Sequence, residues 1–112
     1  WINLNESATN LNKIYSTASK HSTKVIALTT GNFKYTTLFL WPANLYYEGR
    51  SVELRDSAIK ISKELPNVVY VDMVERNKTV PFDHVKEAPD HLHLSDEGAK
   101  YWHDAIKERV NF

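Results

Sequence analysis

The segment near the C-terminus carries an aspartate three residues before a histidine, directly ahead of an amphipathic stretch. These residues are Asp90 and His93. A carboxylate in this position can accept one ring N–H and fix the imidazole tautomer, which leaves the second ring nitrogen free to take a proton from a nucleophile. The pair therefore predicts a general base, although a D-x-x-H pattern met alone is more often a capping aspartate beside a surface histidine.

A general base needs a nucleophile, and the chain offers no convincing one. It has no cysteine, and no serine or threonine stands in a Gly-flanked strand-to-helix turn. Ser95 follows the histidine closely, but it is the expected N-cap of the last helix, and its hydroxyl is then committed to backbone N–H groups. The glycines Gly31, Gly49 and Gly98 build no phosphate-binding loop.

The same segment also allows an interpretation as a metal site. His91 and His93 alternate along an extended segment, so their rings would face the same way. Asp90, Asp83 and His84 are further candidate ligands. Zinc sites usually show a recognisable ligand spacing, and no third and fourth ligand stands at one here. We therefore expect neither a metal nor an organic cofactor.

The second feature that could carry chemistry is an aromatic-rich stretch at residues 30–50. Its aromatic residues are Phe33, Tyr35, Phe39, Trp41, Tyr46 and Tyr47. They either form an acyl- or sugar-binding wall or simply cover an edge of the core. Exposure decides between the two, because a contiguous exposed apolar surface marks a binding site. The substrate-binding candidates are Phe39, Trp41, Tyr46 and Tyr47.

The elements that must position these residues alternate between helix and strand. Apolar periodicity predicts a helix at 6–21, a strand at 24–29, a helix at 51–65, a strand at 68–72 and a helix at 95–110. Both strands are short apolar runs, which is typical of strands buried on both faces. Strands joined by helices pair in parallel, so we expect an α/β layered fold. Residues 30–50 and 73–91 follow the carboxyl ends of the strands, where such sheets bind ligands.

Two strands make a poor sheet, and neither carries the charges or proline that protect an edge strand. We therefore expect further strands from outside this chain or from a second copy. The chain begins at Trp1 and not at Met, which indicates a processed, trimmed or fragmentary polypeptide. Residues 1–112 are then a single, partial domain.

Composition is that of an ordinary globular domain, with 42% hydrophobic and 25% charged residues among 112. Lys+Arg and Asp+Glu both number 14, so no net charge attracts nucleic acid or an acidic membrane. No apolar run approaches the roughly 20 residues that span a bilayer. No basic segment followed by an apolar one indicates a signal peptide.

The C-terminal region resembles the corresponding part of SGNH/GDSL hydrolases. The resemblance is strongest over Asp90-His91-Leu92-His93-Leu94-Ser95-Asp96-Glu97-Gly98, which is similar to the family's D-x-x-H block continued as H-L-S-x-x-G and a helix. It extends weakly over the rest of the chain. The resemblance implies an α/β fold of the flavodoxin-like type, a three-layer α/β/α sandwich with a parallel sheet, of which this chain carries the C-terminal half.

By this resemblance His93 is the catalytic base and Asp90 its orienting acid, in the hydrolysis of an O-acyl ester through an acyl-serine. The family's G-D-S nucleophile block, its oxyanion-hole glycine block and its G-x-N-D block are all absent here. We therefore expect the serine to come from outside this chain, on a complementing N-terminal chain or within a homo-oligomer. The chain alone is expected to be inactive. An extracytoplasmic location is compatible with the family.

Two alternative functions stay open. The same pair could serve an O-acyltransferase that passes the acyl group to a polysaccharide hydroxyl, and the aromatic stretch makes carbohydrate a candidate for the alcohol side of the ester. Alternatively, the chain is a non-catalytic α/β binding module that uses residues 33–47 to bind a partner or glycan.

Overall fold

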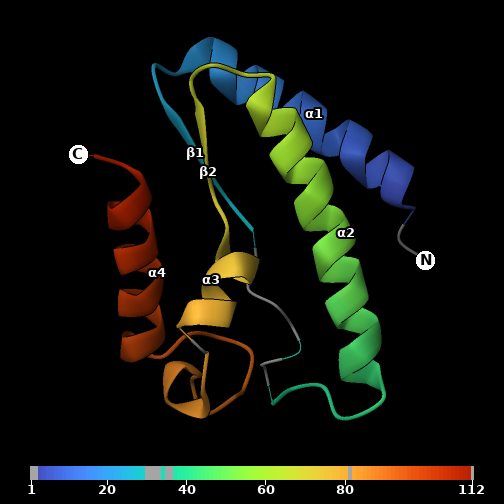
Figure 1. The fold of residues 1–112 in the computed structure, drawn as a ribbon, viewed down its shortest axis with the longest axis vertical. Coiled ribbons are helices and arrows are strands. Elements are labelled where there is room, and N and C mark those ends of the chain that lie inside the picture. Colours follow the sequence, from blue (N-terminus) through green and yellow to red (C-terminus); the bar gives the residue numbers. More distant parts are fainter. Residues whose placement is uncertain (1–2, 30–33, 35–36, 81, 112) are drawn as a thin grey trace.

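The computed structural model describes residues 3–29, 34, 37–80 and 82–111. The elements in chain order are α1 (Leu4–His21), β1 (Val25–Leu28), α2 (Ala43–Lys63), β2 (Val68–Val71), α3 (Met73–Thr79), the 3₁₀ turn η2 (His84–Lys86) and α4 (Asp96–Arg109). Figure 1 shows the strands between α4 and the pair of helices α1 and α2. The predicted α/β class and the parallel pairing of the strands are confirmed.

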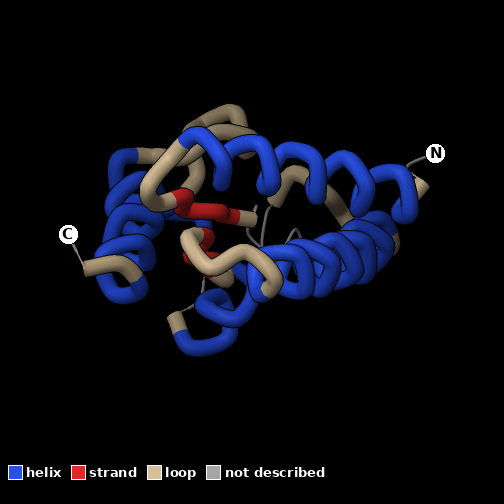
Figure 2. Tube along the Cα trace, turned by 90° about the horizontal axis from the view of Figure 1, so that it is seen from above, coloured by secondary structure: helices blue, strands red, loops and turns tan. Residues whose placement is uncertain are grey.

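The two strands lie side by side in parallel register, with Val25 opposite Val68 and Leu28 opposite Val71. Successive side chains of a strand point to opposite faces, and each face has its own helices (Figure 2). Ala27 and Tyr70 belong to a buried cluster with residues of α1 and α2, namely Tyr15, Ala58 and Ile61. Val71 belongs to the cluster on the other face, with Met73, Tyr101 and Ala105.

The prediction that the first strand is buried on both faces is wrong. Only Ala27 of β1 is buried, and Leu28 at its end is 36% exposed. The physical reason is that β1 pairs with one strand alone among the described residues. β2 lies more deeply, with Tyr70 and Val71 both buried.

The second helix begins at Ala43 and not at residue 51. The first buried residue of α2 is Ser51, and the turns before it pack against no core. A helical segment that buries no face has no apolar stripe, so periodicity could not reveal it. Likewise, residues 73–91 contain α3 and η2 where no element was predicted, because helices this short carry too few residues for a period to show.

The N-terminal helix starts at Leu4, ahead of the predicted start at residue 6, with Asn3 as its N-cap. The side chain of Asn3 accepts hydrogen bonds from the N–H groups of Asn5 and Glu6, which is the usual capping geometry. None of the helices in the described ranges is long and apolar enough to cross a membrane.

A single side chain joins the end of α1 to the start of β2. The amide nitrogen of Asn67 donates to the backbone carbonyls of Ser19 (2.9 Å) and Ser22 (2.8 Å). Its side-chain oxygen accepts the Ser19 hydroxyl, and its backbone carbonyl accepts the N–H of Val25 at 2.9 Å. These bonds fix where β1 enters the sheet, and so they set the register of the two strands.

We expect Asn67→Ala to lower the free energy of unfolding by roughly 2 kcal/mol, because the part-buried carbonyl and hydroxyl of Ser19 and the exposed carbonyl of Ser22 lose their partner. Urea titration followed by circular dichroism measures this change. Asn10→Ala on the exposed side of α1 is the matched control and should change stability by less than about 0.5 kcal/mol. Equal effects of the two variants would show that the side-chain bonds of Asn67 do not stabilise the fold.

Candidate active site

The aspartate and histidine predicted as a pair are joined by two hydrogen bonds within one turn, and a third bond ties the aspartate to Leu92. Asp90 Oδ1 accepts the backbone N–H groups of Leu92 and His93, both at 3.0 Å. Asp90 Oδ2 lies 2.5 Å from His93 Nδ1. The turn itself therefore presents the imidazole to the carboxylate, and no second element is needed to bring the two together.

The charge state of Asp90 follows from these contacts. The N–H of His93, then its imidazole, and then the N–H of Leu92 hold the pKa of the Asp90 carboxyl well below its usual range. An ionised carboxylate only accepts, so a neutral His93 carries its proton on Nδ1. Nε2 then keeps its lone pair, which is the arrangement a general base requires.

The His93 ring is open to solvent. Its side chain is 74% exposed and that of Asp90 is 52% exposed. No group in the described part of the chain other than Asp90 hydrogen-bonds to the imidazole. The base thus faces outward, where the reacting group of another molecule can reach Nε2.

The turn is closed by a short antiparallel contact. Glu87 and Leu94 form an isolated β-bridge, and the N–H of Ala88 donates to the His93 carbonyl at 2.9 Å. At the tip, His91 has a φ of 58°, in the left-handed region that few non-glycine residues adopt. The positive φ reverses the chain so that His93 returns toward Asp90.

Sequence reasoning missed the buried carboxylate beside this turn. The Glu87 side chain is 4% exposed, and it accepts the backbone N–H of Thr37 at 2.8 Å and the Thr37 hydroxyl at 2.6 Å. His91 Nδ1 lies 3.2 Å from the same carboxylate and 2.8 Å from the Thr37 hydroxyl. Glu87 therefore ties the aromatic stretch to the turn. No local pattern indicates a contact across 50 residues.

Ser95 has the role that was predicted, as the N-cap of α4. Its hydroxyl accepts the N–H of Gly98 at 3.1 Å and donates to the carbonyl of Val85 at 2.6 Å. The hydroxyl is thus committed at both donor and acceptor sites and is not presented to His93. Gly98 lies against η2, and a Cβ there would be 2.2 Å from the Lys86 carbonyl oxygen.

The metal interpretation of the histidines finds no support in the geometry. His91 points toward Glu87 and Thr37, whereas His93 points toward Asp90, because the positive φ at His91 breaks the extended alternation. Asp83 pairs with Lys86 at 3.2 Å. Among the residues the structure describes, no three His, Cys, Asp or Glu side chains gather as a metal site would require.

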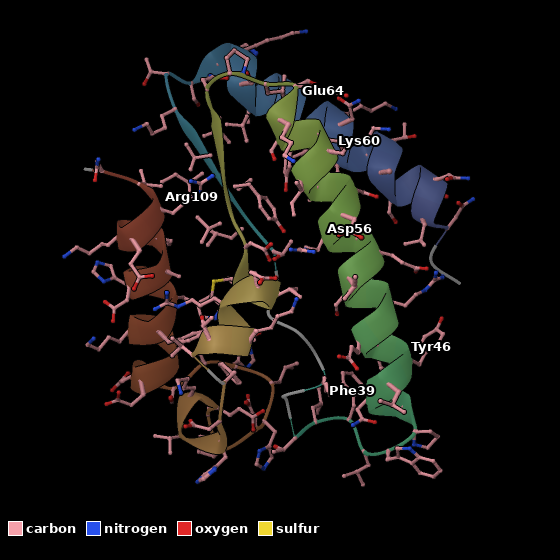
Figure 3. The ribbon with its side chains drawn as sticks, viewed as in Figure 1. Phe39, Tyr46, Asp56, Lys60, Glu64 and Arg109 are labelled. Atoms are coloured by element: carbon pink, nitrogen blue, oxygen red, sulfur yellow. The ribbon has the colours of Figure 1, made fainter. Side chains whose placement is uncertain are left out.

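The aromatic candidates form a surface at the same end of the molecule as the turn (Figures 1 and 3). Phe39 stacks on Tyr47 with centroids 4.2 Å apart, and Tyr46 meets Tyr47 edge to face. Trp41 is 77% exposed. The exposure favours a binding wall over a cover for the core. Phe33 and Tyr35 lie outside the described residues.

Comparison with protein-family models, with curated proteins and with solved structures finds no match for this chain. The candidate site consists of an ionised aspartate, a histidine whose Nε2 has no partner among the described residues, and an aromatic surface at the same end of the molecule.

We expect Asp90→Asn to invert the tautomer of neutral His93. The side-chain oxygen would stay on the N–H groups of Leu92 and His93, so the amide NH₂ would face Nδ1 and turn it into an acceptor. Long-range ¹H–¹⁵N NMR above about pH 8, where an ordinary histidine is neutral, reads the tautomer directly. Asp104→Asn on α4 is the control, and an unchanged His93 tautomer in Asp90→Asn would refute the assignment.

The same variant tests the charge of Asp90 through its effect on stability. Because the folded-state pKa is lowered, the ionised carboxylate stabilises the fold fully above about pH 5, well over the unfolded pKa of about 3.9. This advantage over Asp90→Asn should shrink as pH falls toward the folded pKa. Urea titrations between about pH 3 and pH 7 measure it.

Gly98→Ala should destabilise the protein by about 1–3 kcal/mol, because the added methyl group would collide with the Lys86 backbone. Gly49→Ala is a matched control within α2, where a Cβ meets nothing within 4 Å. That variant should instead stabilise by up to about 1 kcal/mol through helix propensity. Thermal unfolding distinguishes the two, and a tolerated Gly98→Ala would show that α4 does not pack this closely on η2.

Proposed function

We propose that this chain is the C-terminal portion of an SGNH-type serine esterase that hydrolyses O-acyl esters. The observation that carries the proposal is the Asp90–His93 pair, with Nδ1 held 2.5 Å from the carboxylate and Nε2 open to solvent. In this mechanism His93 takes the proton of an attacking serine hydroxyl and later returns it to the leaving alcohol, while Asp90 orients the ring and stabilises the imidazolium.

The serine is supplied from outside the chain. No serine hydroxyl among the described residues hydrogen-bonds to the His93 ring, and the nearest in sequence, Ser95, is committed to Gly98 and Val85. Without oxyanion donors, the pair alone would lack a large part of the rate acceleration. The chain by itself is therefore inactive in this proposal.

The edge of β1 is where the missing part would add. β1 has β2 as its only partner strand within the described ranges, and the apolar side chains of Leu28 on β1 and Ile14 on α1 are exposed. A further parallel strand at this edge would extend the sheet toward a three-layer α/β/α sandwich. A complementing N-terminal chain, or a second copy of this chain, is the proposed source.

The aromatic surface supports an ester with a carbohydrate alcohol. Aromatic faces such as Trp41 and Tyr46 suit the apolar faces of sugar rings, and Glu87 holds this stretch against the His93 turn through Thr37. The same pair could transfer an acyl group to a sugar hydroxyl instead of to water, which would make the assembly an O-acyltransferase.

A non-catalytic binding module is the second candidate. The observation that favours it is the exposed aromatic surface, which needs no nucleophile to function. The two functions depend on different side chains. Binding to a glycan or partner would be lost with Trp41→Ala and kept with His93→Ala, whereas catalysis requires His93.

We expect His93→Ala to reduce ester hydrolysis at least about a thousand-fold in the assembled enzyme, because loss of the base removes the proton acceptor. The assay is p-nitrophenyl acetate turnover by the assembly purified from the native source, with a serine-reactive phosphonate identifying the nucleophilic chain. His103→Ala, an exposed histidine on α4, is the control and should retain full activity.

Sedimentation of the variant assembly separates loss of chemistry from loss of association. Wild-type turnover by a properly assembled His93→Ala form would refute the proposed mechanism. An assembly that never turns over an ester and carries no phosphonate-reactive serine would refute the esterase and favour the binding module.

A further inference from the structure

The free edge of β2 forms the floor of a groove between α2 and α4. The groove has a volume of about 650 Å³ and is lined by residues of α2, all of β2, and residues of α3 and α4. It lies on the opposite side of the sheet from the β1 edge that the proposed esterase would complete. It is therefore a separate surface, and its use does not depend on the proposed function.

The backbone of β2 offers hydrogen-bonding groups to this groove. Val25 and Ala27 are register partners of Val68 and Tyr70, and the N–H of Val25 donates to the carbonyl of Asn67. The alternation of a parallel ladder then turns the peptide groups of Val68 and Tyr70 away from β1. The N–H of Val68 already donates to the Leu65 carbonyl at 3.2 Å, so the groups that remain for the groove are the Val68 carbonyl and the N–H and carbonyl of Tyr70. The Arg109 side chain confirms this direction, because its Nε donates to the Tyr70 carbonyl at 3.4 Å.

Arg109 covers the edge only weakly. Figure 3 places it between α4 and the strands, and 3.4 Å is long for an N–H···O bond. An incoming backbone N–H could replace the guanidinium on the Tyr70 carbonyl. Arg109 would then be released to pair with a carboxylate of the incoming chain.

The charged side chains that line the groove differ in whether they have a partner of opposite charge. Each lining carboxylate already has a cation: Asp72 accepts Arg55 at 2.6 Å, Glu75 accepts Lys78 at 2.9 Å, and Glu108 pairs with Arg76. Arg55 and Lys78 stand outside the lining residues. Two lining cations, Lys63 and Arg109, have no carboxylate partner in the part of the chain that the structure describes. The lining carries three cations and three carboxylates, so its net charge is zero. Within the described residues Lys63 and Arg109 are the lining cations that an incoming carboxylate could pair with beside the strand edge.

We propose that this groove binds an extended acidic peptide segment of a partner protein by β-strand addition to β2. The peptide backbone would pair with the Val68 carbonyl and with the N–H and carbonyl of Tyr70. Its alternate side chains would pack over the strand, and its carboxylates would meet Lys63 and Arg109. A second copy of this chain fits less well, because two-fold pairing of β2 edges would bring the cations of both copies together.

The test uses the full chain and a labelled hexapeptide of alternating glutamate and valine. Binding is followed by fluorescence anisotropy and by ¹H–¹⁵N NMR of the chain. We expect a shift and slowed hydrogen exchange at the Tyr70 amide, and no binding by the same peptide N-methylated at alternate nitrogens, since β-addition needs those N–H groups. A peptide with lysine in place of glutamate should bind at least about tenfold more weakly.

Charge reversal in the chain gives the matched variants. Arg109→Glu and Lys63→Glu should each weaken binding of the acidic peptide about tenfold or more, with the fold checked by circular dichroism. Lys107→Glu alters the same helix outside the groove and should leave binding unchanged apart from weak, salt-screened effects.

Three results would overturn the proposal. These are equal binding of the lysine and glutamate peptides, an unperturbed Tyr70 amide at saturation, and concentration-dependent self-association that protects Tyr70 without any peptide. The last result would assign the groove to a second copy of the chain.

Discussion

The parallel pairing of β1 with β2 is the constraint on which the positions of the other elements depend. Parallel strands point their carboxyl ends to the same edge, so the loops that follow both strands lie at one end of the molecule. One of these loops carries the aromatic surface and the other carries the Asp90–His93 turn. Asn67 makes this arrangement specific, because its bonds to α1 and to Val25 set the register.

The candidate site depends on one contact between residues close in the sequence and on one contact between residues far apart in it. Asp90 and His93 meet within a single turn, so their geometry is set by adjacent residues and by the positive φ at His91. Glu87 acts over a longer distance, since its buried carboxylate holds Thr37 and with it the start of the aromatic surface. The His93 turn and the aromatic surface are thereby kept together although 50 residues separate Thr37 from Glu87.

The two edges of the sheet have different surroundings. The edge of β1 has exposed apolar side chains beside it, which suits the permanent addition of a strand with its own hydrophobic face. The edge of β2 lies in a groove lined by Lys63 and Arg109, with one long hydrogen bond from Arg109, which suits reversible pairing. The two strands that the structure describes thus leave each edge of the sheet available for a different kind of contact.

The sequence by itself determined the features that depend on neighbouring residues. These include the alternation of helices and strands, the capping role of Ser95 and the pairing of Asp90 with His93, because periodicity, caps and three-residue spacings are local. Only the tertiary structure decided the features that depend on distant residues. The exposure of Leu28, the unpredicted start of α2 at Ala43, the close packing of Gly98 on Lys86 and the buried Glu87 all depend on which surfaces meet, and no local pattern records that.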